Sequence, residues 1–241
     1  MTKILIMALS IILTACCSNR ASSKSENADV NVEQAPSRLI ALSFDDGPND
    51  VITPQVLDIL QQFNVPASFF VIGQYINDAT ATQMTRAISL GCEIQNHSLT
   101  HIQMTQLTKE EIAEEVRKTD ELIEQYTGTR PWLFRPPFID HDSKMHETIS
   151  HTFICGVGCE DWVPTVSAQA RYDALMATVK DGDIILLHDF TGNDNTVAAL
   201  RMLIPELKKQ GYTFVTVTDL FKAKGITPSA HSGQLYSNVL Q

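Results

Sequence analysis

Basic residues are scarce in this chain. Its 241 residues include 18 Lys and Arg against 28 Asp and Glu, so the formal net charge at pH 7 is -10. A protein without a basic surface repels phosphate, which argues against nucleic acid and anionic lipid headgroups as partners. The charge balance therefore predicts no nucleic-acid partner and fits neutral or amine-bearing substrates better.

The chain also lacks an apolar run long enough to be a stable anchor across a bilayer. Lys3 precedes a short apolar run, residues 4–13, which has the length of a signal-peptide core. Leu13-Thr14-Ala15-Cys16 then resembles the lipobox of bacterial lipoproteins, in which the cysteine is lipidated and becomes the mature N-terminus. We expect a lipoprotein signal peptide over residues 1–15 and a location in the bacterial cell envelope, with membrane association only through the lipid at Cys16. An ordinary secreted protein is the alternative.

Cysteines are few beyond this segment, although export would place the protein in a compartment that permits disulfides. Only Cys92, Cys155 and Cys159 remain, and three thiols cannot all pair. A bridge between Cys155 and Cys159 and buried free thiols both stay open, because the sequence does not give the separation of the Cα atoms.

The composition changes along the chain. Residues 16–37 are rich in Ser, Asn, Ala and Glu without apolar periodicity, which predicts a flexible tether. With 44% hydrophobic residues overall, the chain can bury a large core in one domain, which we place over residues 38–222. The segment 223–241 is polar and aperiodic, and we expect a C-terminal tail without an assigned role.

Strand-like and helix-like segments alternate within the domain. Apolar, β-branched or aromatic runs predict about seven strands, over residues 39–44, 67–72, 92–94, 132–134, 153–157, 183–188 and 213–217. Helical periodicity predicts helices over residues 53–63, 81–90, 108–126, 143–151, 168–180 and 195–210. Thr108 and Glu111 make a capping box at the start of the third helix. This alternation indicates an α/β fold with a parallel sheet, either closed as a barrel or open and doubly wound.

Several residues that can carry chemistry follow these strands. Asp45 and Asp46 end the first strand in Ser43-Phe44-Asp45-Asp46-Gly47-Pro48, and His97 and His101 have the spacing of one helical turn. One Asp and two His are enough for a divalent metal with an open coordination position, and the second Asp is then a neighbouring base. An Asx turn and a pair of surface histidines are the alternatives. Together, the four residues favour metal-assisted hydrolysis.

Three further residues fall at strand ends, where α/β folds gather catalytic groups. His188 closes the apolar run 184–187, and its imidazole titrates near neutral pH, which suits a general acid. Arg135 is followed by the rigid pair Pro136-Pro137 and is a candidate partner for a carboxylate. Asp161 also lies at a strand end.

Together, these motifs resemble, in order over residues 38–222, the polysaccharide deacetylases of carbohydrate esterase family 4, also called the nodulation-type deacetylase domain. The resemblance implies a distorted (β/α)7-8 barrel and a deacetylase catalytic domain over this range. It implies that Asp45 is the general base and that Ser98 steadies the loop after the third strand. The metal ligands that it implies are Asp46, His97 and His101.

The third motif, Phe134-Arg135-Pro136-Pro137-Phe138, implies that Arg135 pairs with Asp45. It also implies that the Phe138 N–H helps to hold the oxyanion and that Pro137 lines the substrate pocket. Members of the family usually carry Tyr where this chain has Phe138, but a main-chain donor does not depend on the side chain.

The last two motifs resemble Asp161-Trp162 and Leu187-His188. They imply that Asp161 orients His188 as the acid, that Trp162 walls the pocket and that Leu187 lines the acetyl pocket. Upstream of Asp161 the family commonly has Trp and Asp where this chain has Cys155 and Gly158. This departure bears on pocket shape and substrate preference more than on the chemistry.

The resemblance implies removal of N-acetyl groups from a polysaccharide that contains N-acetylglucosamine, peptidoglycan or chitin-like, with release of acetate. One divalent metal is expected; the N2O ligand set favours zinc, and cobalt, nickel or manganese would fit the same geometry. An O-acetyl esterase acting on xylan or a similar glycan is the alternative enzyme. A glycan-binding lipoprotein that has lost its metal is the alternative outside catalysis.

Overall fold

The computed structural model describes residues 38–241. The predicted signal peptide 1–15, the lipidation site Cys16 and the tether 16–37 lie outside the described residues. Within residues 38–241, no helix has the length and apolarity that are needed to cross a membrane.

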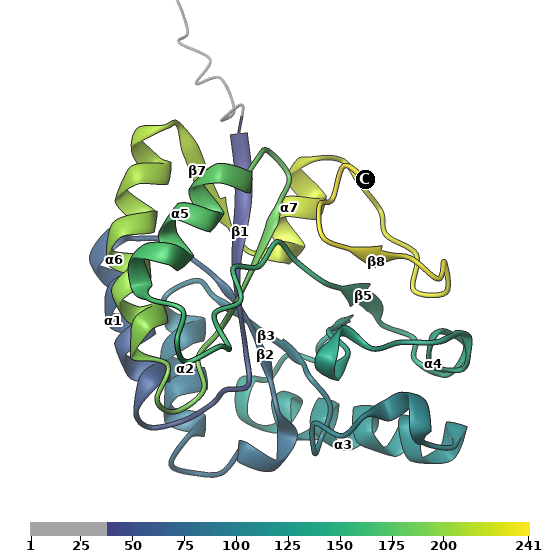
Figure 1. Cartoon of the computed structure of the whole chain (residues 1–241). Helices are drawn as coiled ribbons and strands as arrows, with labels where there is room; N and C mark the ends of the chain where they lie inside the picture. The colour runs from purple at the N-terminus through teal and green to yellow at the C-terminus, as the bar shows by residue number, and fades with distance from the viewer. Residues whose placement is uncertain (1–37) are drawn as a thin grey trace, which may run out of the picture. The chain divides into compact units, whose positions relative to one another are not determined.

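Strands and helices alternate along the described chain (Figure 1). The strands are β1 (Arg38–Asp45), β2 (Ser68–Val71), β3 (Glu93–Asn96), β4 (Leu133–Phe134), β5 (Thr152–Ile154), β6 (Ile184–His188), β7 (Tyr212–Val215) and β8 (Leu235–Tyr236). The α-helices are α1 (Ile52–Phe63), α2 (Ala81–Ser89), α3 (Lys109–Thr127), α4 (Ser143–Thr148), α5 (Ala168–Thr178), α6 (Asp194–Lys209) and α7 (Val217–Ala223). Three short 3-10 turns are η1 (Gly73–Tyr75), η2 (Met104–Gln106) and η3 (Pro137–Ile139).

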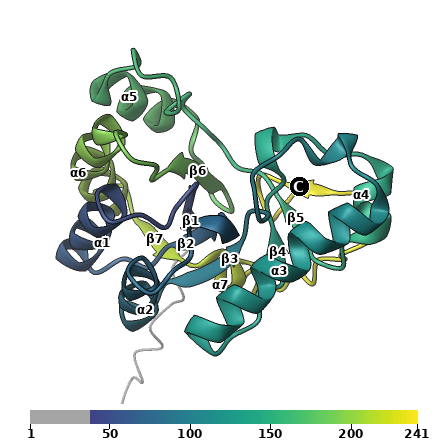
Figure 2. The ribbon, with the colours of Figure 1, turned by 90° about the horizontal axis from the view of Figure 1, so that it is seen from below.

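The strands form one parallel sheet in the order β6-β1-β2-β3-β4-β5-β8, and β7 pairs with the first half of β1. Beyond β5, Val157 makes a parallel bridge to Ile185 on β6. This bridge links the two sides of the sheet, so the sheet is nearly closed into a distorted barrel, as predicted. Figure 2 looks onto the end at which the strands finish, with α1, α2, α5 and α6 on the outside.

The two faces of β1 show how the sequence positions the site. Ile40, Leu42 and Phe44 pack in the apolar cluster between the sheet and the outer helices. Leu39 and Ala41 point into the barrel, where they meet apolar side chains from β2, β4, β5, β6 and α7. Side chains alternate along a strand, so Asp45 continues this inner face. The strand therefore delivers a carboxylate to the mouth of the barrel.

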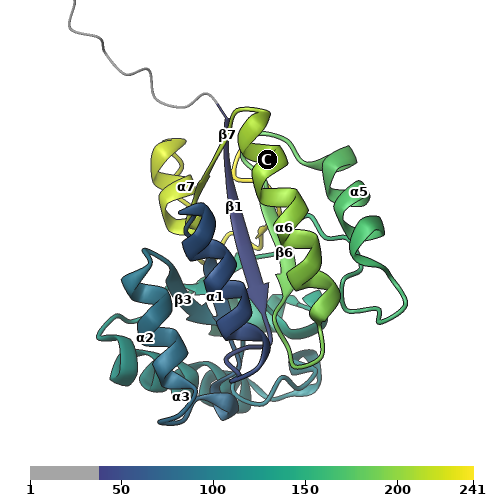
Figure 3. The same ribbon diagram turned by 90° about the vertical axis from the view of Figure 1, so that its left-hand side faces the viewer.

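Local signals in the sequence account for the longest helix. The Thr108 hydroxyl accepts a hydrogen bond from the Glu111 N–H, and the Glu111 side chain accepts one from the Thr108 N–H. Gly128 ends α3 with a φ of 71°, in the left-handed region that glycine adopts without strain. The predicted capping box is confirmed. Figure 3 shows how α1 and α6 run beside β1 on the outer face.

The C-terminal segment differs from the predicted tail. It contains β8, which pairs with β5, and Tyr236 and Val239 are buried in the inner apolar cluster. Asn238 Nδ2 donates to Asp183 Oδ1 at 2.6 Å. Residues 235–239 therefore belong to the same sheet and core as the rest of the domain. A strand of two residues has no periodicity to recognise, and α7 was missed for the same reason of length.

The structure also answers the question of the cysteines. Cys92, Cys155 and Cys159 are all free thiols. Burial raises the pKa of Cys92 to about 11 and that of Cys159 to about 12. These two thiols are therefore protonated and unreactive at neutral pH.

Candidate metal centre and active site

Three side chains from the ends of two strands converge at the mouth of the barrel. Asp46 follows directly after β1, and His97 and His101 follow β3. The Nε2 atoms of both histidines lie 3.4 Å from Asp46 Oδ1. Tetrahedral coordination with bonds of about 2.1 Å places ligand atoms about 3.4 Å apart. The structure therefore brings the three predicted ligands together with a spacing suited to one cation; we call them the metal triad.

The backbone leaves its regular conformation to produce this convergence. Asp46 has a φ of 74°, so its carboxylate turns toward the same site as that of Asp45 instead of the opposite side of the sheet. Residues 97–101 form a loop, not the helical turn that their spacing indicates. Ser98 and His101 have φ values of 66° and 55°, and Ser98 Oγ accepts a hydrogen bond from the His101 N–H at 3.0 Å. Ser98 thus holds the loop, as the resemblance implied.

Burial and hydrogen bonds keep the metal triad in the state that binds a cation. His97 Nδ1 donates to the Arg135 carbonyl at 2.7 Å, so the lone pair of Nε2 faces the site. Burial and then His97 lower the pKa of His101. Burial alone would raise the pKa of Asp46, but attraction to His97, His188 and His101 outweighs it and lowers the pKa. Within residues 38–241, Asp46 Oδ1 is buried without a hydrogen-bond partner, and this oxygen with two imidazoles fits a divalent cation.

Asp45 lies beside the metal triad and is paired with a fully buried arginine. Arg135, which follows β4, donates from Nη1 to Asp45 Oδ1 at 2.5 Å and from Nη2 to Ser43 Oγ at 2.8 Å. Its Nη2 also donates to the Cys155 carbonyl at 2.5 Å. The second oxygen, Asp45 Oδ2, lies 3.8 Å from His97 Nε2. The arginine therefore fixes the carboxylate and leaves one oxygen facing the metal triad.

His188 ends β6 and is held by Asp161, which lies in the loop between β5 and α5 and not at a strand end as predicted. The ring Nδ1 of His188 lies 2.8 Å from Asp161 Oδ1, and the main-chain N–H of His188 donates to Asp161 Oδ2 at 2.8 Å. Burial by itself lowers the pKa of His188, but the hydrogen bond and charge of Asp161, together with Asp45 and Asp46, raise it to about 9. The imidazole is therefore protonated at neutral pH and presents Nε2 as a proton donor.

A buried network around Asp161 was missed by the sequence reasoning. Asp161 Oδ2 accepts from Thr196 Oγ1 at 2.8 Å and from Asn193 Nδ2 at 3.3 Å. Arg171 donates to the Asn193 side chain at 2.6 Å and to Thr196 Oγ1 at 2.7 Å. A single arginine in a helix usually indicates a solvated residue. The available signal for the burial of Arg171 was its position one helical turn before Leu175, which is also buried.

The backbone at residues 138 and 139 is strained beside the metal triad. Phe138 and Ile139 have φ values of 58° and 56°, a region that a β-branched residue rarely adopts. The Ile139 N–H donates to the Pro136 carbonyl at 3.0 Å, whereas the Phe138 N–H has no partner within residues 38–241. The Phe138 ring is 66% exposed and meets His101 edge to face at 4.6 Å, while Pro137 is buried. The Phe138 N–H is therefore free to donate to a ligand; its role at an oxyanion stays a prediction.

The structure places Trp162 beside His188 but turns Leu187 away from it. Trp162 is 51% exposed, and its ring lies edge to face with His188 at 5.7 Å. Leu187 is 1% exposed and packs in the cluster beneath the helices. It does not line the cleft, because neighbours along a strand point to opposite faces. Leu186 is the strand neighbour that shares the face of His188. It packs closely against Gly156, where an added Cβ would lie 2.6 Å from Leu186 Cβ.

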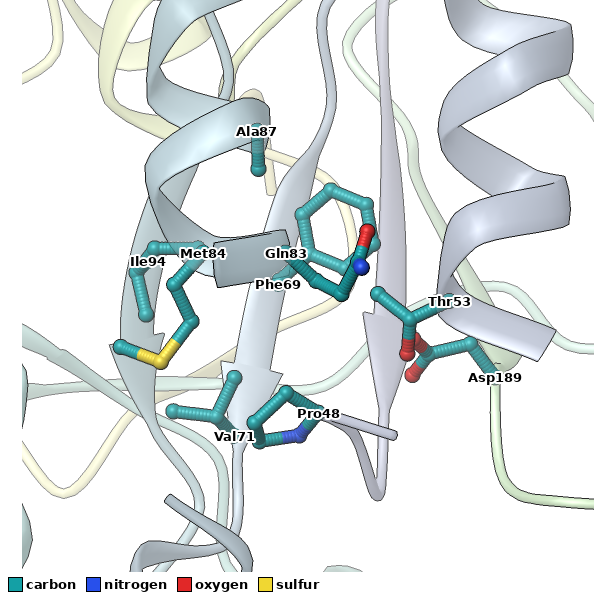
Figure 4. Close-up of a pocket in the computed structure, with 9 residues that line it drawn as sticks. All are labelled: Pro48, Thr53, Phe69, Val71, Gln83, Met84, Ala87, Ile94 and Asp189. Atoms are coloured by element: carbon teal, nitrogen blue, oxygen red, sulfur yellow. The ribbon is translucent and has the colours of Figure 1, made fainter. Parts of the chain in front are cut away.

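A second buried carboxylate supports the turn after β1, and it too was missed. Asp189 accepts a hydrogen bond from Thr53 Oγ1 at 2.5 Å, and its N–H donates to the Asp45 carbonyl at 3.0 Å. Figure 4 shows Thr53 and Asp189 together at the edge of a cavity of about 10 Å³. An added Cβ on Gly47 would lie 2.7 Å from both oxygens of Asp189. Burial and the nearby aspartates raise the pKa of Asp189 to about 7. Its position directly after a strand-end histidine was the only signal.

The fold and the site together define a class of protein. Asp45 and His188 are register partners on the adjacent parallel strands β1 and β6, so they face the same mouth of the barrel. A carboxylate that can accept a proton, an imidazole that can give one and three convergent metal ligands surround one point. These are the catalytic groups of a hydrolase that activates water.

Comparisons with known proteins identify the family. A family model described as polysaccharide deacetylase matches residues 33–152. A bifunctional xylanase/deacetylase of Pseudobutyrivibrio xylanivorans is 42% identical over 95% of this chain and 37% of the relative. A peptidoglycan-N-acetylglucosamine deacetylase of Bacillus cereus is 36% identical over 78% of this chain and 90% of the relative. The chain belongs to the polysaccharide deacetylases of carbohydrate esterase family 4.

A solved structure agrees with the observed fold. The family 4 acetyl xylan esterase from Clostridium thermocellum, in complex with a cobalt ion, superposes with a TM-score of 0.82 at 39% identity. The match covers 85% of this chain and 100% of that chain. The chain thus matches the whole of that solved chain, whereas it spans 37% of the length of the xylanase/deacetylase.

Proposed function

We propose that this protein removes N-acetyl groups from a polysaccharide that contains N-acetylglucosamine, with one divalent metal bound by the metal triad. The substrate would be peptidoglycan or a chitin-like polymer, and acetate would be released. The observation that carries the proposal is the pairing of His188 with Asp161, which keeps a charged imidazole at the site. An amine is a poor leaving group unless it is protonated, so amide hydrolysis needs such a donor.

The residues of the chain divide the work between them. A divalent cation on Asp46, His97 and His101, with zinc the first choice, would lower the pKa of a water and polarise the acetyl carbonyl. Asp45 takes the proton of the attacking water on its free oxygen, while Arg135 holds the other oxygen in place.

Charge that develops on the acetyl oxygen is met by the Phe138 N–H, a type of contact whose removal costs about 3 kcal/mol. His188 then gives its Nε2 proton to the departing amine as the C–N bond breaks. The products are acetate and a free amino sugar. Asp161 holds the imidazolium in place through the hydrogen bond to Nδ1.

An O-acetyl esterase acting on xylan is the second candidate. It is favoured by the names of two relatives, the xylanase/deacetylase of Pseudobutyrivibrio xylanivorans and the acetyl xylan esterase of Clostridium thermocellum. An alkoxide leaves more readily than an amine, so this reaction would depend less on His188. A glycan-binding protein without a metal is disfavoured, because Asp45, the metal triad, Arg135 and His188 are all present and correctly placed.

The test is acetate release after metal reconstitution, from chitin oligomers, peptidoglycan and acetylated xylan. N-deacetylation predicts release from the first two, and preferential release from xylan would support the esterase. The same assay on His97→Ala, with metal content measured after dialysis, tests the metal triad. A parent protein that retains no metal and releases no acetate would refute the proposal.

We further propose that the protein is lipid-anchored at Cys16 in the bacterial cell envelope. The proposal rests on the sequence Leu13-Thr14-Ala15-Cys16 alone. Labelled palmitate should enter the full chain, and a Cys16→Ala variant should lose the label. A labelled Cys16→Ala variant would overturn this proposal.

A further inference from the structure

A groove of about 470 Å³ runs from the metal triad across the turn after β1. Three segments border it: the β1–α1 turn, the chain around η1 and the loop between β6 and α6. Its volume lies within the usual range for small-molecule sites, about 300 to 1,000 Å³. Neither Phe138 nor Trp162 lines this groove. The groove therefore has a wall of its own, which it shares with the metal triad only through Asp46.

The groove has the lining that suits a sugar ring. Tyr75 is 45% exposed at its wall. Phe190 is half-buried, and its ring lies 6.1 Å from that of His188. Gln74 and Asn77 also line the groove, and their amides donate to the main-chain carbonyls of Thr100 and Tyr75. Aromatic faces bury the C–H faces of a sugar, and amides bond its hydroxyl groups.

Tyr75 is fixed relative to the metal triad by backbone hydrogen bonds. The Gly73 N–H donates to the Ser98 carbonyl at 2.9 Å, and the Gln74 N–H donates to the Leu99 carbonyl at 2.9 Å. Ser98 and Leu99 belong to the loop that carries the two histidine ligands. The wall is thus preorganised, which lowers the entropy cost of binding a ligand.

The charge of the groove selects among sugars. Asp46 and Asp50 are the charged side chains in its lining, and no Lys, Arg or His lines it. Asp50 is exposed in the turn between β1 and α1. A carboxylate-bearing sugar would meet repulsion from Asp50, and no Lys or Arg in the lining offsets it. A neutral or amine-bearing ring meets no such penalty.

We propose that the groove is a sugar subsite, in which Tyr75 and Phe190 hold the ring next to the residue that is deacetylated. Asp50 disfavours rings that carry a carboxylate, such as those with a lactyl or uronic acid group. The preferred substrate is then a neutral or partly deacetylated glycan. This inference rests on the proposed function, because it assigns the substrate class of the same site.

The first test measures binding without turnover. Chitotetraose is titrated by calorimetry into the metal-loaded Asp45→Asn variant, so that the ligand stays intact. Adding Tyr75→Ala or Phe190→Ala should weaken binding by about tenfold. Trp132→Ala, a half-exposed aromatic outside the groove, is the matched control and should leave affinity unchanged. Thermal melts show that each variant is folded. Unchanged affinity in both groove variants would overturn the proposal.

The second test measures charge selection. Values of kcat/KM are compared for chitotetraose and for a carboxymethylated chitotetraose. Asp50→Lys should raise kcat/KM for the anionic substrate, relative to kcat/KM for the neutral one, by about tenfold. Asp219→Lys, on α7 away from the carboxyl ends of the strands (Figure 1), should leave the ratio unchanged.

The outcomes separate this inference from the proposed function. An unchanged ratio in Asp50→Lys refutes the charge selection. If no glycan yields acetate but chitotetraose still binds in a Tyr75-dependent manner, the proposed function fails and the subsite stands. If acetate is released and the groove variants behave as the parent, the subsite fails and the proposed function stands.

Discussion

Replacing Asp161 by Asn removes the charge that keeps His188 protonated while preserving the size of the side chain. Burial already lowers the pKa of His188, and the hydrogen bond and charge of Asp161 are the largest effects that oppose it and raise the pKa to about 9. Without this charge, Asp45 and Asp46 oppose burial alone. We therefore expect the pKa of His188 to fall to about 6.5, the ordinary value of the side chain, or lower.

The rate consequence can be worked out at pH 8. An imidazole with a pKa of about 9 is about 90% protonated there, and one with a pKa of about 6.5 is about 3% protonated. The fraction of enzyme with its acid in place falls about thirtyfold. We expect kcat/KM for an N-acetyl substrate to fall at least that much at pH 8 and less at pH 6. An O-acetyl substrate should lose less, because its leaving group needs the proton less.

The raised pKa of His188 also predicts how the stability of the fold depends on pH. The folded pKa of His188 lies above the unfolded value, so its stabilisation is fully present below about pH 6.5 and is lost as the pH rises through 9. Its upper limit is about 3 kcal/mol. The difference in free energy of unfolding between the parent and Asp161→Asn should therefore be larger at pH 6 than at pH 10. Urea unfolding at the two pH values measures this difference, and Asp173→Asn, an exposed carboxylate on α5, is the control.

Two measurements test whether Asp161 raises the pKa of His188 and whether His188 is the general acid. The first is NMR titration of the His188 imidazole in the metal-free protein, and the second is the alkaline limb of kcat/KM with saturating metal. An Asp161→Asn variant whose alkaline limb does not move would refute the assignment of His188 as the acid.

Three further outcomes are expected. Asp45→Asn should keep its metal, measured by elemental analysis, and lose about 10²- to 10⁴-fold in acetate release, because the base is gone and the metal triad is untouched. Arg135→Ala should cost about 3 to 5 kcal/mol in denaturant unfolding, since it leaves the buried Asp45 carboxylate unpaired; a loss below 1 kcal/mol would contradict the buried pair. Tyr236→Ala should lower the free energy of unfolding by about 3 to 5 kcal/mol if β8 belongs to the core, whereas a mobile tail would show no change.

Much of the fold and site could be predicted because the signals are local. A run such as residues 39–44 reads as a strand whatever surrounds it, and a capping box lies within four residues of sequence. The grouping of two aspartates with two histidines was predictable because strand ends in a parallel sheet meet at one edge, whereas the choice of Asp46 as the ligand came from the family resemblance. Asp45, Asp46, His97 and His101 could therefore be grouped without knowing the conformation that joins them.

The missed features depend on contacts that the sequence does not encode locally. Arg171 supports Asp161 through Asn193 and Thr196, more than twenty residues further along the chain. The assignment of Leu187 to the pocket failed on strand parity, since a shift of one residue moves a side chain to the other face. β8 was missed because two residues cannot display a period of two.

One relation between the two proton-transfer groups explains why each has a buried partner. Asp45 and His188 are register partners on adjacent strands, so their side chains leave the same face of the sheet. Opposite charges this close would pair with each other, and a paired base and acid would serve neither water nor amine. Arg135 draws Asp45 toward β4, and Asp161 draws His188 toward the loop after β5. The two buried pairs hold the carboxylate and the imidazole toward different partners, which keeps base and acid from pairing with each other. The cost of burying Arg135 and Asp161 is therefore a condition of the chemistry and not only of the fold.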